Sequence, residues 1–470
     1  MPPLHIAVER GQRTPLTTQI YSAIREAIES GRLARGAKLP SWQDLAAQLG
    51  VSRGTVRAAY ERLMDEQFAL GMGPAGTRVA ERPARSSTSN RLSDATQPPE
   101  PFQGFGTPPL AFQMGVPSQA AFPFKLWSRV LTRASRQIAC VPVSYPDPRG
   151  DPELRKELAA YLAIARGLHC EPSQLLITAG FSGALGLAVR ALQLEGNEAW
   201  VEDPGFSLTR TALSLARMKV NGVRVDAEGL DVEAGIRSAP NAALAVVTPG
   251  QQAPLGMTMS LPRRLALLEW ARRTGAWIVE DDYLSELQLQ GRAAPALASL
   301  DNHGRVLHIG SFSKTISPTL RLGFLVIPPE LVRRFGDAAA CLAPAPALGV
   351  QRAVAEFMRE GQYLRHLRRM KCVYRAQRES LLRCLRDIAS DWLKVEASAG
   401  LAVVASLPHA VSDIDIASRA LPLGLAPRAL SAWSMQTPAM RGLLLCVTNL
   451  NELRLPDDCR HLVELVRQAL

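Results

Sequence analysis

Lys314 is the residue of this chain whose chemistry stands out. Lysine occurs only seven times among the 54 lysines and arginines, and this one lies in the serine-rich sequence Gly310-Ser311-Phe312-Ser313-Lys314-Thr315. An amine can form an imine with an aldehyde cofactor, whereas a guanidinium keeps its proton in proteins and is not nucleophilic. Lys314 is therefore a candidate Schiff-base lysine.

Acidic and phenolic side chains precede this lysine at a suitable place. Glu280-Asp281-Asp282-Tyr283 follows the apolar run 276–279, and the end of a buried strand is where α/β sheets bind ligands. A pyridine-ring cofactor needs a carboxylate at its ring nitrogen, a phenol near its ring oxygen, a lysine for its aldehyde and donors for its phosphate. Taken singly, Asp281 could cap a helix, Tyr283 could be core and Lys314 could be surface. Their joint occurrence favours a cofactor site built from Asp281, Tyr283, Lys314, Ser311, Ser313 and Arg321.

The first 80 residues suggest a second site of a different kind. Apolar residues at helical spacing predict a helix through Ile20, Ile24 and Ile28, and a second helix that ends at Gly50. Ser52 offers an N-cap for a third helix whose buried stripe is Val56, Tyr60 and Leu63.

This third helix leaves Arg53 and Arg57 together on its open face, one turn apart. Helix, glycine turn and helix with exposed arginines is the helix-turn-helix pattern, whose second helix enters the major groove of DNA. The glycine-rich run 71–79 predicts a β-turn that would act as a wing, and we expect Gly76 and Thr77 of this wing to contact DNA. The alternative is a three-helix module with a solvated basic face.

Composition and patterning place these sites in separate domains. Residues 82–109 are rich in Ser, Thr and Pro and predict a linker between a domain at 1–81 and a larger one at 110–470. In the larger domain, apolar runs such as 242–247 and 306–309 alternate with helical patterns such as 261–273, which predicts a mainly parallel sheet wrapped by helices. From about 345 onward, a long basic helix at 351–387 and short strands predict a smaller α+β subdomain.

The net charge and the cysteine pattern limit which partners, metal or disulfide sites and cellular compartment we expect. The net charge of +11 suits a polyanionic partner, although an arginine-rich composition gives the same balance without one. Seven scattered cysteines without a Cys-x-x-Cys pair indicate neither a zinc site nor a disulfide framework, and no metal site is expected. No apolar run is long enough to cross a membrane. We expect a cytoplasmic protein without a membrane partner.

The sequence motifs of the N-terminal segment are more specific than its apolar periodicity. Gly36-Ala37-Lys38-Leu39-Pro40-Ser41 and Leu49-Gly50-Val51-Ser52-Arg53-Gly54-Thr55-Val56 closely resemble the winged helix-turn-helix of GntR-type bacterial repressors. The resemblance implies a double-stranded DNA operator as partner. It assigns DNA contacts to Arg53, Thr55 and Arg57, with Ser52 contacting a phosphate.

The larger domain resembles the fold-type I aminotransferases, most closely the domain of MocR-type regulators. The resemblance is carried by Ser144-Tyr145-Pro146-Asp147-Pro148-Arg149-Gly150, Glu202-Asp203-Pro204-Gly205-Phe206, Glu280-Asp281-Asp282-Tyr283 and Ser311-Phe312-Ser313-Lys314. It implies a seven-stranded sheet, a head-to-tail, domain-swapped dimer, and pyridoxal 5′-phosphate bound to Lys314. The remaining implied contacts are Asp281 at the ring nitrogen, Tyr283 at the ring hydroxyl, Phe206 on the ring, Ser182, Gly183, Ser311, Ser313 and Arg321 at the phosphate, and Tyr145 at the partner's phosphate.

Three departures bear on activity. Aminotransferases place an Asn where this chain has Ala253, and a carboxylate-binding arginine of a related regulator is Leu208 here. The second carboxylate-binding arginine of aminotransferases, expected in the strand 442–447, has no counterpart within it, although Arg441 is adjacent and Arg428 is nearby. A buried carboxylate without a bidentate arginine is poorly held. We therefore expect a regulator that senses the cofactor or an amine reacting with it, with a residual transaminase half-reaction left open. The alternatives are a working aminotransferase with a DNA-binding arm and a cofactor-free dimerisation domain.

Overall fold

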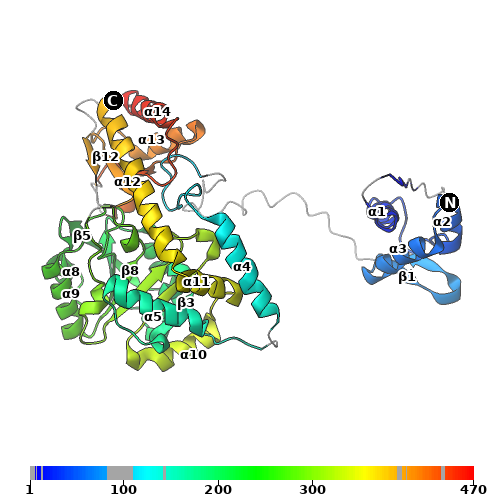
Figure 1. Cartoon of the computed structure of the whole chain (residues 1–470), viewed down its shortest axis with the longest axis horizontal. Helices are drawn as coiled ribbons and strands as arrows, with labels where there is room; N and C mark the ends of the chain where they lie inside the picture. Colours follow the sequence, from blue (N-terminus) through cyan, green and yellow to red (C-terminus); the bar gives the residue numbers. More distant parts are fainter. Residues whose placement is uncertain are drawn as a thin grey trace. The chain divides into compact units, whose positions relative to one another are not determined.

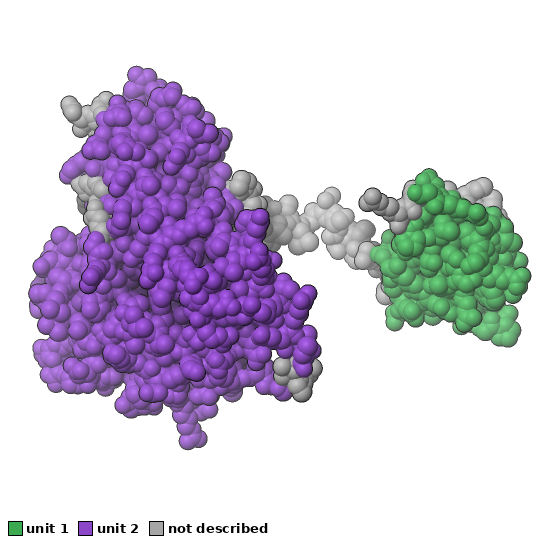
Figure 2. All heavy atoms as spheres, viewed as in Figure 1, with its two compact units in different colours: residues 1–98 green, residues 99–470 purple. Residues whose placement is uncertain are grey.

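The computed structural model separates the chain into two compact units, residues 1–98 and 99–470 (Figures 1 and 2). It describes residues 6, 8–11, 14–81, 109–140, 144–289, 291–388, 394–397, 400–435 and 440–470, with the side chains of 396 and 397 excepted. The predicted linker, apart from Pro109, lies outside the described residues. Each unit is considered by itself.

The first unit is a three-helix module with a short hairpin. Ser41 caps the second helix by accepting a hydrogen bond from the Asp44 amide, and Gly50 ends it in the left-handed conformation, as predicted. Ser52 caps the third helix. The elements are α1 (Leu16–Glu29), α2 (Trp42–Leu49), α3 (Arg53–Asp65), β1 (Ala69–Gly71) and β2 (Thr77–Val79), and the predicted wing is the antiparallel β1–β2 hairpin.

The core of this unit contains the predicted stripes. Ile20 and Ile24 of α1 and Val56, Tyr60 and Leu63 of α3 are buried together, and the predicted Ile28 packs against them while partly exposed. Arg53 and Arg57 lie on the exposed side of α3. The helix-turn-helix expected from the sequence is therefore present.

The second unit is built on a mixed sheet in the order β3-β10-β9-β8-β7-β4-β5-β6. Strands β9, β8, β7, β4 and β5 are parallel, whereas β10 runs antiparallel to both of its neighbours. The predicted seven strands are confirmed, and the short β6 adds an eighth, antiparallel to β5. The bounds are β3 (Leu175–Thr178), β4 (Glu198–Asp203), β5 (Lys219–Asp226), β6 (Gly229–Leu230), β7 (Ala242–Val247), β8 (Trp277–Asp282), β9 (Val306–Ser311) and β10 (Gly323–Val326).

Helices cover both faces of this sheet. One core packs α6 and α10 against residues such as Val201 and Leu307, and another packs α8 and α9 against Trp200 and Ile278. Burial on both faces explains why these strands read as continuous apolar runs. The helices are α4 (Phe124–Ala139), α5 (Pro152–Arg166), α6 (Gly180–Leu192), α7 (Ser207–Leu215), α8 (Val232–Ser238), α9 (Leu261–Thr274) and α10 (Val332–Leu342).

The C-terminal part forms a smaller antiparallel sheet, in the order β11-β12-β14-β13, packed against helices. Phe112 bridges to this sheet at Cys446, and Ala111 bridges to Leu425, a long-range pairing that the sequence did not indicate. The elements are α11 (Leu348–Arg359), α12 (Gln362–Ile388), α13 (Asp413–Ala420), α14 (Leu455–Arg467), β11 (Lys394–Ala397), β12 (Ala402–Ser406), β13 (Arg428–Ala429) and β14 (Gly442–Cys446).

The prediction of a single helix over residues 351–387 is wrong. Two helices, α11 and α12, are separated at Gly361, whose φ of +68° interrupts the right-handed helix. Within the described residues, no helix combines the length and apolar character needed to cross a membrane, and no group of three metal-ligating side chains is clustered.

Candidate functional site

The acids that end β8 are divided between two faces of the sheet. Successive side chains of a strand point to opposite faces, so Glu280 and Asp282 share one face and Asp281 occupies the other. Glu280 accepts hydrogen bonds from the amides of Leu297 (2.7 Å) and Ala298 (3.0 Å) and contacts His308 at 2.9 Å. Asp282 pairs with Arg166 at 2.6 Å in the interior. Both acids therefore bind other groups of the protein, although Asp282 Oδ1, unlike its Oδ2, has no hydrogen-bond partner among the described residues.

Asp281 has a different environment. It is buried, and its Oδ1 has no hydrogen-bond partner among the described residues. Burial, followed by the nearby carboxylates of Asp282 and Glu202, raises the pKa of Asp281 to about 8, against the opposing effect of Lys314. A buried carboxylate without a partner is costly. Asp281 is thus suited to a cationic or proton-donating ligand atom.

Lys314 lies close enough to Asp281 and Arg321 to feel the charge of both side chains. Its Nζ donates a hydrogen bond to the carbonyl oxygen of Gly115 at 2.9 Å. Burial lowers the pKa of Lys314, and Arg321 acts in the same direction, while Cys446 and Asp281 oppose the shift. A lysine with a lowered pKa is a better nucleophile at neutral pH. The sequence did not indicate Gly115 or Cys446 as its neighbours.

The predicted phosphate contacts meet at one edge of the sheet. Gly323 of β10 is paired with Thr178 at the end of β3 and with Ser311 at the end of β9, so these strand ends are adjacent. Ser182 and Gly183 lie in the first turn of α6, where helix amide groups have no intrahelical acceptor. Arg321 reaches the same turn, with Nη2 3.4 Å from the carbonyl oxygen of Ala179. A helix N-terminus with an arginine is a suitable anion site.

Ser313 continues this group along the chain. Its amide donates a hydrogen bond to the Ser311 hydroxyl at 3.2 Å, and both residues are partly buried. The loop therefore carries two hydroxyl groups and Lys314 within four residues, next to the α6 N-terminus.

Two of the predicted site residues are aromatic, Tyr283 and Phe206. Tyr283 directly follows β8, and burial, with smaller effects of Asp281 and Glu202, raises its pKa well above the ordinary value. Phe206 precedes α7 and lies 5.9 Å from Trp433 and 6.5 Å from Phe181, measured between ring centroids. Trp433 was not a predicted site residue.

Glu202 is a further buried acid of this region. Its carboxylate accepts hydrogen bonds from the Thr248 amide at 3.0 Å and from Gln252 Nε2 at 3.3 Å. Burial raises the pKa of Glu202 to about 7, and these hydrogen bonds limit the shift. Glu202 thus adds negative charge near Asp281 when it is ionised.

Two predicted features are not brought into this group within one chain. Tyr145 is fully exposed, with a relative accessibility of 102%. In β14, where an aminotransferase-type arginine was sought, the side chains are apolar, and the neighbouring Arg441 guanidinium donates to the carbonyl oxygens of His409 and Val411. Arg428, on β13, is paired with Leu444 of β14, and its side chain is exposed.

The predicted DNA contacts cluster on the first unit. The Ser52 hydroxyl accepts from the Thr55 amide at 3.1 Å and lies 2.8 Å from the Thr55 hydroxyl, so both side chains stand at the N-terminus of α3. Arg57 forms an exposed pair with Glu61 at 2.8 Å, and Arg53 is exposed. Gly76 and Thr77 lie where the hairpin enters β2, and φ at Gly76 is +92°. An exposed ion pair of this kind is weak enough to be exchanged for a phosphate.

A winged helix on one unit and this mixed sheet on the other define a class of two-domain regulators. Residues 16–79 match the family of bacterial regulatory proteins called gntR, and residues 135–430 match aminotransferase class I and II. The chain belongs to the MocR-type branch of the GntR family, in which the two are fused, and it is a DNA-binding transcriptional regulator.

Relatives and solved structures agree with this assignment. The chain is 34% identical over 452 residues to the probable rhizopine catabolism regulatory protein MocR of Rhizobium meliloti, covering 94% of this chain and 91% of that protein. It is 30% identical over 448 residues to the pyridoxine biosynthesis transcriptional regulator PdxR of Corynebacterium glutamicum, covering 94% of each. A kynurenine aminotransferase of Pyrococcus horikoshii has the same fold as the second unit, with a TM-score of 0.70 at 24% identity over 77% of this chain and 91% of that one.

Proposed function

We propose that pyridoxal 5′-phosphate binds at Lys314 and sets the DNA affinity of this regulator. In this proposal Lys314 anchors the cofactor, Asp281 holds its ring nitrogen, Tyr283 its ring hydroxyl, and Phe206 packs on the ring. Its phosphate is held by Ser311, Ser313, Arg321 and the α6 amides at Ser182 and Gly183. Pyridoxal phosphate supplies an aldehyde that reacts with amines.

The observation that carries the proposal is the buried Asp281. Its unpartnered Oδ1 lies beside an amine of lowered pKa, and the anion-binding end of α6 lies next to that amine. A protonated ring nitrogen would supply the partner that Asp281 lacks, and a phosphate would satisfy the orphan amides of α6. The residues present therefore fit this group at both of its charged ends.

Sensing is favoured over catalytic turnover by the residues around Lys314. Leu208 and Ala253 stand where an arginine and an asparagine were sought, and the described side chains of β14 include no arginine. A substrate carboxylate would then lack the bidentate partner that holds it for reaction. The name of the PdxR relative concerns pyridoxine biosynthesis, which suits a domain that responds to the cofactor itself.

We further propose a cytoplasmic homodimer with exchanged domains. The exposed Tyr145 supports this, because a tyrosine predicted to bind phosphate lies outside the site of its own chain. In a dimer it would complete the partner's site.

Absorbance with and without Lys314 tests the cofactor. The full-length protein with added pyridoxal phosphate is expected to show the visible band of lysine-bound cofactor, and Lys314→Ala is expected to abolish it. Lys219→Ala, which changes an exposed lysine of β5, is the matched control and should keep the band. A protein that stays colourless under cofactor excess contradicts the proposal. Multiple turnovers with a panel of amino and keto acids would instead favour the enzyme.

A further inference from the structure

The positive charge of this DNA-binding protein is concentrated outside its winged helix. Residues 1–81 contain 10 lysines and arginines and 8 acids. Helix α4 contains four lysines and arginines and no acid, and α12 contains eight against two acids. The rest of residues 110–470 contains 29 lysines and arginines and 31 acids. Two helices therefore account for the basic excess of the second unit.

Many of these cations face solvent without an acidic partner. We call six of them the basic helix patch, and none forms an ion pair with a described residue. Each is exposed, and Arg365 and Arg375 donate hydrogen bonds to the Gln362 side chain and the Leu289 carbonyl oxygen, respectively. The patch consists of Arg129, Arg136, Arg365, Arg368, Arg369 and Arg375.

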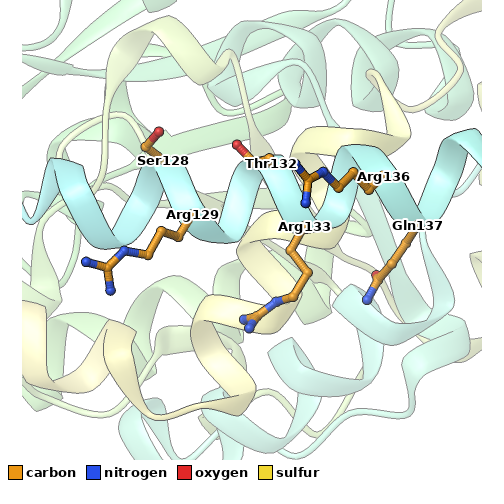
Figure 3. Close-up of a pocket in the computed structure, with 6 residues that line it drawn as sticks. All are labelled: Ser128, Arg129, Thr132, Arg133, Arg136 and Gln137. Carbon is orange, nitrogen blue, oxygen red and sulfur yellow. The ribbon is translucent and has the colours of Figure 1, made fainter.

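Ion pairs link α4 to α11 and to the turn that precedes α12. Arg133 of α4 contacts Glu356 of α11 and Glu360, and the bond to Glu360 measures 2.6 Å. Glu360 lies two residues before α12 begins, so the middle of α4 adjoins the start of α12 (Figure 1). Figure 3 shows Arg129 and Arg133 extending from the same side of α4, with Arg136 lying across the helix. These three arginines line a shallow pocket together with Ser128, Thr132 and Gln137. Arg133 thus pairs with two acids next to these helices, and the six arginines of the patch form no ion pair with a described residue.

We propose that the basic helix patch is a second DNA-binding surface, which contacts the phosphate backbone of DNA flanking the operator. The α12 row from Arg365 to Arg375 extends about 15 Å at 1.5 Å per helical residue, which corresponds to about four base pairs of duplex. We expect these arginines to contact phosphates rather than base edges, so that the patch adds affinity without sequence preference. The inference rests on the DNA-binding function assigned above.

Charge complementarity favours DNA over a second copy of the chain at this surface. A twofold-symmetric contact places the same patch on both partners, and two arginine rows would repel each other. Arginine also suits phosphate because its planar fork donates two parallel hydrogen bonds.

The test compares two triple variants of the full-length protein on two lengths of DNA. Arg365→Gln/Arg368→Gln/Arg369→Gln removes three patch charges, and Arg237→Gln/Arg273→Gln/Arg333→Gln removes three exposed charges elsewhere. Dissociation constants are measured across a salt series on a minimal operator and on the same operator with long flanks. Losing a phosphate contact lowers the slope of log affinity against log salt by ~0.9.

On flanked DNA, the slope of log affinity against log salt is expected to fall for the patch variant by up to three times ~0.9, one such step for each lost contact. Its affinity for flanked DNA should fall roughly tenfold or more at moderate salt, and its affinity for the minimal operator should not change. The control variant should match the parent on both DNAs. Equal slopes for patch variant and parent, an equal loss in both variants, or a changed oligomeric state of the patch variant would overturn the proposal. A loss of affinity for the minimal operator would instead indicate a defect in DNA binding by the winged helix.

Discussion

The pKa of Asp281 links the candidate cofactor site to the stability of the protein. Burial raises this pKa to about 8, while an aspartate in an unfolded chain has a pKa of about 4. Between these values the folded protein retains a proton that the unfolded chain has lost. The linkage relation then makes the folded state less stable as pH rises through this window.

In the absence of added cofactor, Asp281→Asn is therefore expected to make the fall in stability between pH 5 and pH 8 shallower. Calorimetric melting of the second unit measures it, with Asp337→Asn on the exposed side of α10 as control. The remaining slope should come from Glu202 and Glu286, whose pKa values burial raises to about 7. A slope that Asp281→Asn leaves unchanged would show that this acid does not titrate in that range.

Among single residues, the sequence predicts those whose chemistry is rare in this chain. Lys314 could be identified because lysine is scarce, and Asp281 because it ends an apolar run. The hydrogen bond from Lys314 to Gly115 joins residues 199 positions apart, and the proximity of Cys446 depends on a strand of the smaller sheet. No local pattern encodes such contacts, because they arise only when distant segments pack.

Single elements follow the sequence where a cap or a glycine defines their ends. Ser52 caps α3 with its hydroxyl 3.1 Å from the Thr55 amide. Ser52→Ala is expected to destabilise the first unit by about 1 kcal/mol, because an N-cap hydrogen bond to an otherwise orphan amide is lost. Chemical denaturation monitored by a signal confined to the first unit would measure the loss.

Ser52→Asp restores a capping acceptor and should recover most of this stability, while its negative charge should weaken DNA binding next to a phosphate. If Ser52→Ala and Ser52→Asp lost stability equally, the cap would not be the cause.

Elements whose ends depend on backbone geometry were harder to predict. The helix expected over 351–387 is divided at Gly361, although the flanking residues are good helix formers. Its apolar periodicity continues on both sides of the break, so only the positive φ distinguishes the end of α11 from an ordinary helical glycine. The bridges from residues 111 and 112 to Leu425 and Cys446 were missed for the same reason as the Gly115 contact.

Regulation belongs to the whole molecule, because the candidate cofactor site and the recognition helix lie in different compact units. The protein is taken to have two arrangements, one that binds DNA and one that does not. A cofactor can change DNA affinity only if it binds these two arrangements with different affinities. The coupling free energy of such systems is typically ~1 to 3 kcal/mol, or about 5- to 150-fold in affinity. Reciprocity then requires DNA to change cofactor affinity by the same factor.

We therefore expect the operator dissociation constant to differ by about 5- to 150-fold with and without saturating pyridoxal phosphate, and the cofactor dissociation constant to differ by the same factor with and without operator. Fluorescence anisotropy of labelled operator gives the first ratio and absorbance titration gives the second. Lys314→Ala should bring both ratios to one while it retains the DNA affinity of the cofactor-free protein, whereas Arg57→Ala should weaken DNA binding equally in both states. Two unequal ratios, or an unchanged ratio in Lys314→Ala, would contradict coupling through this lysine.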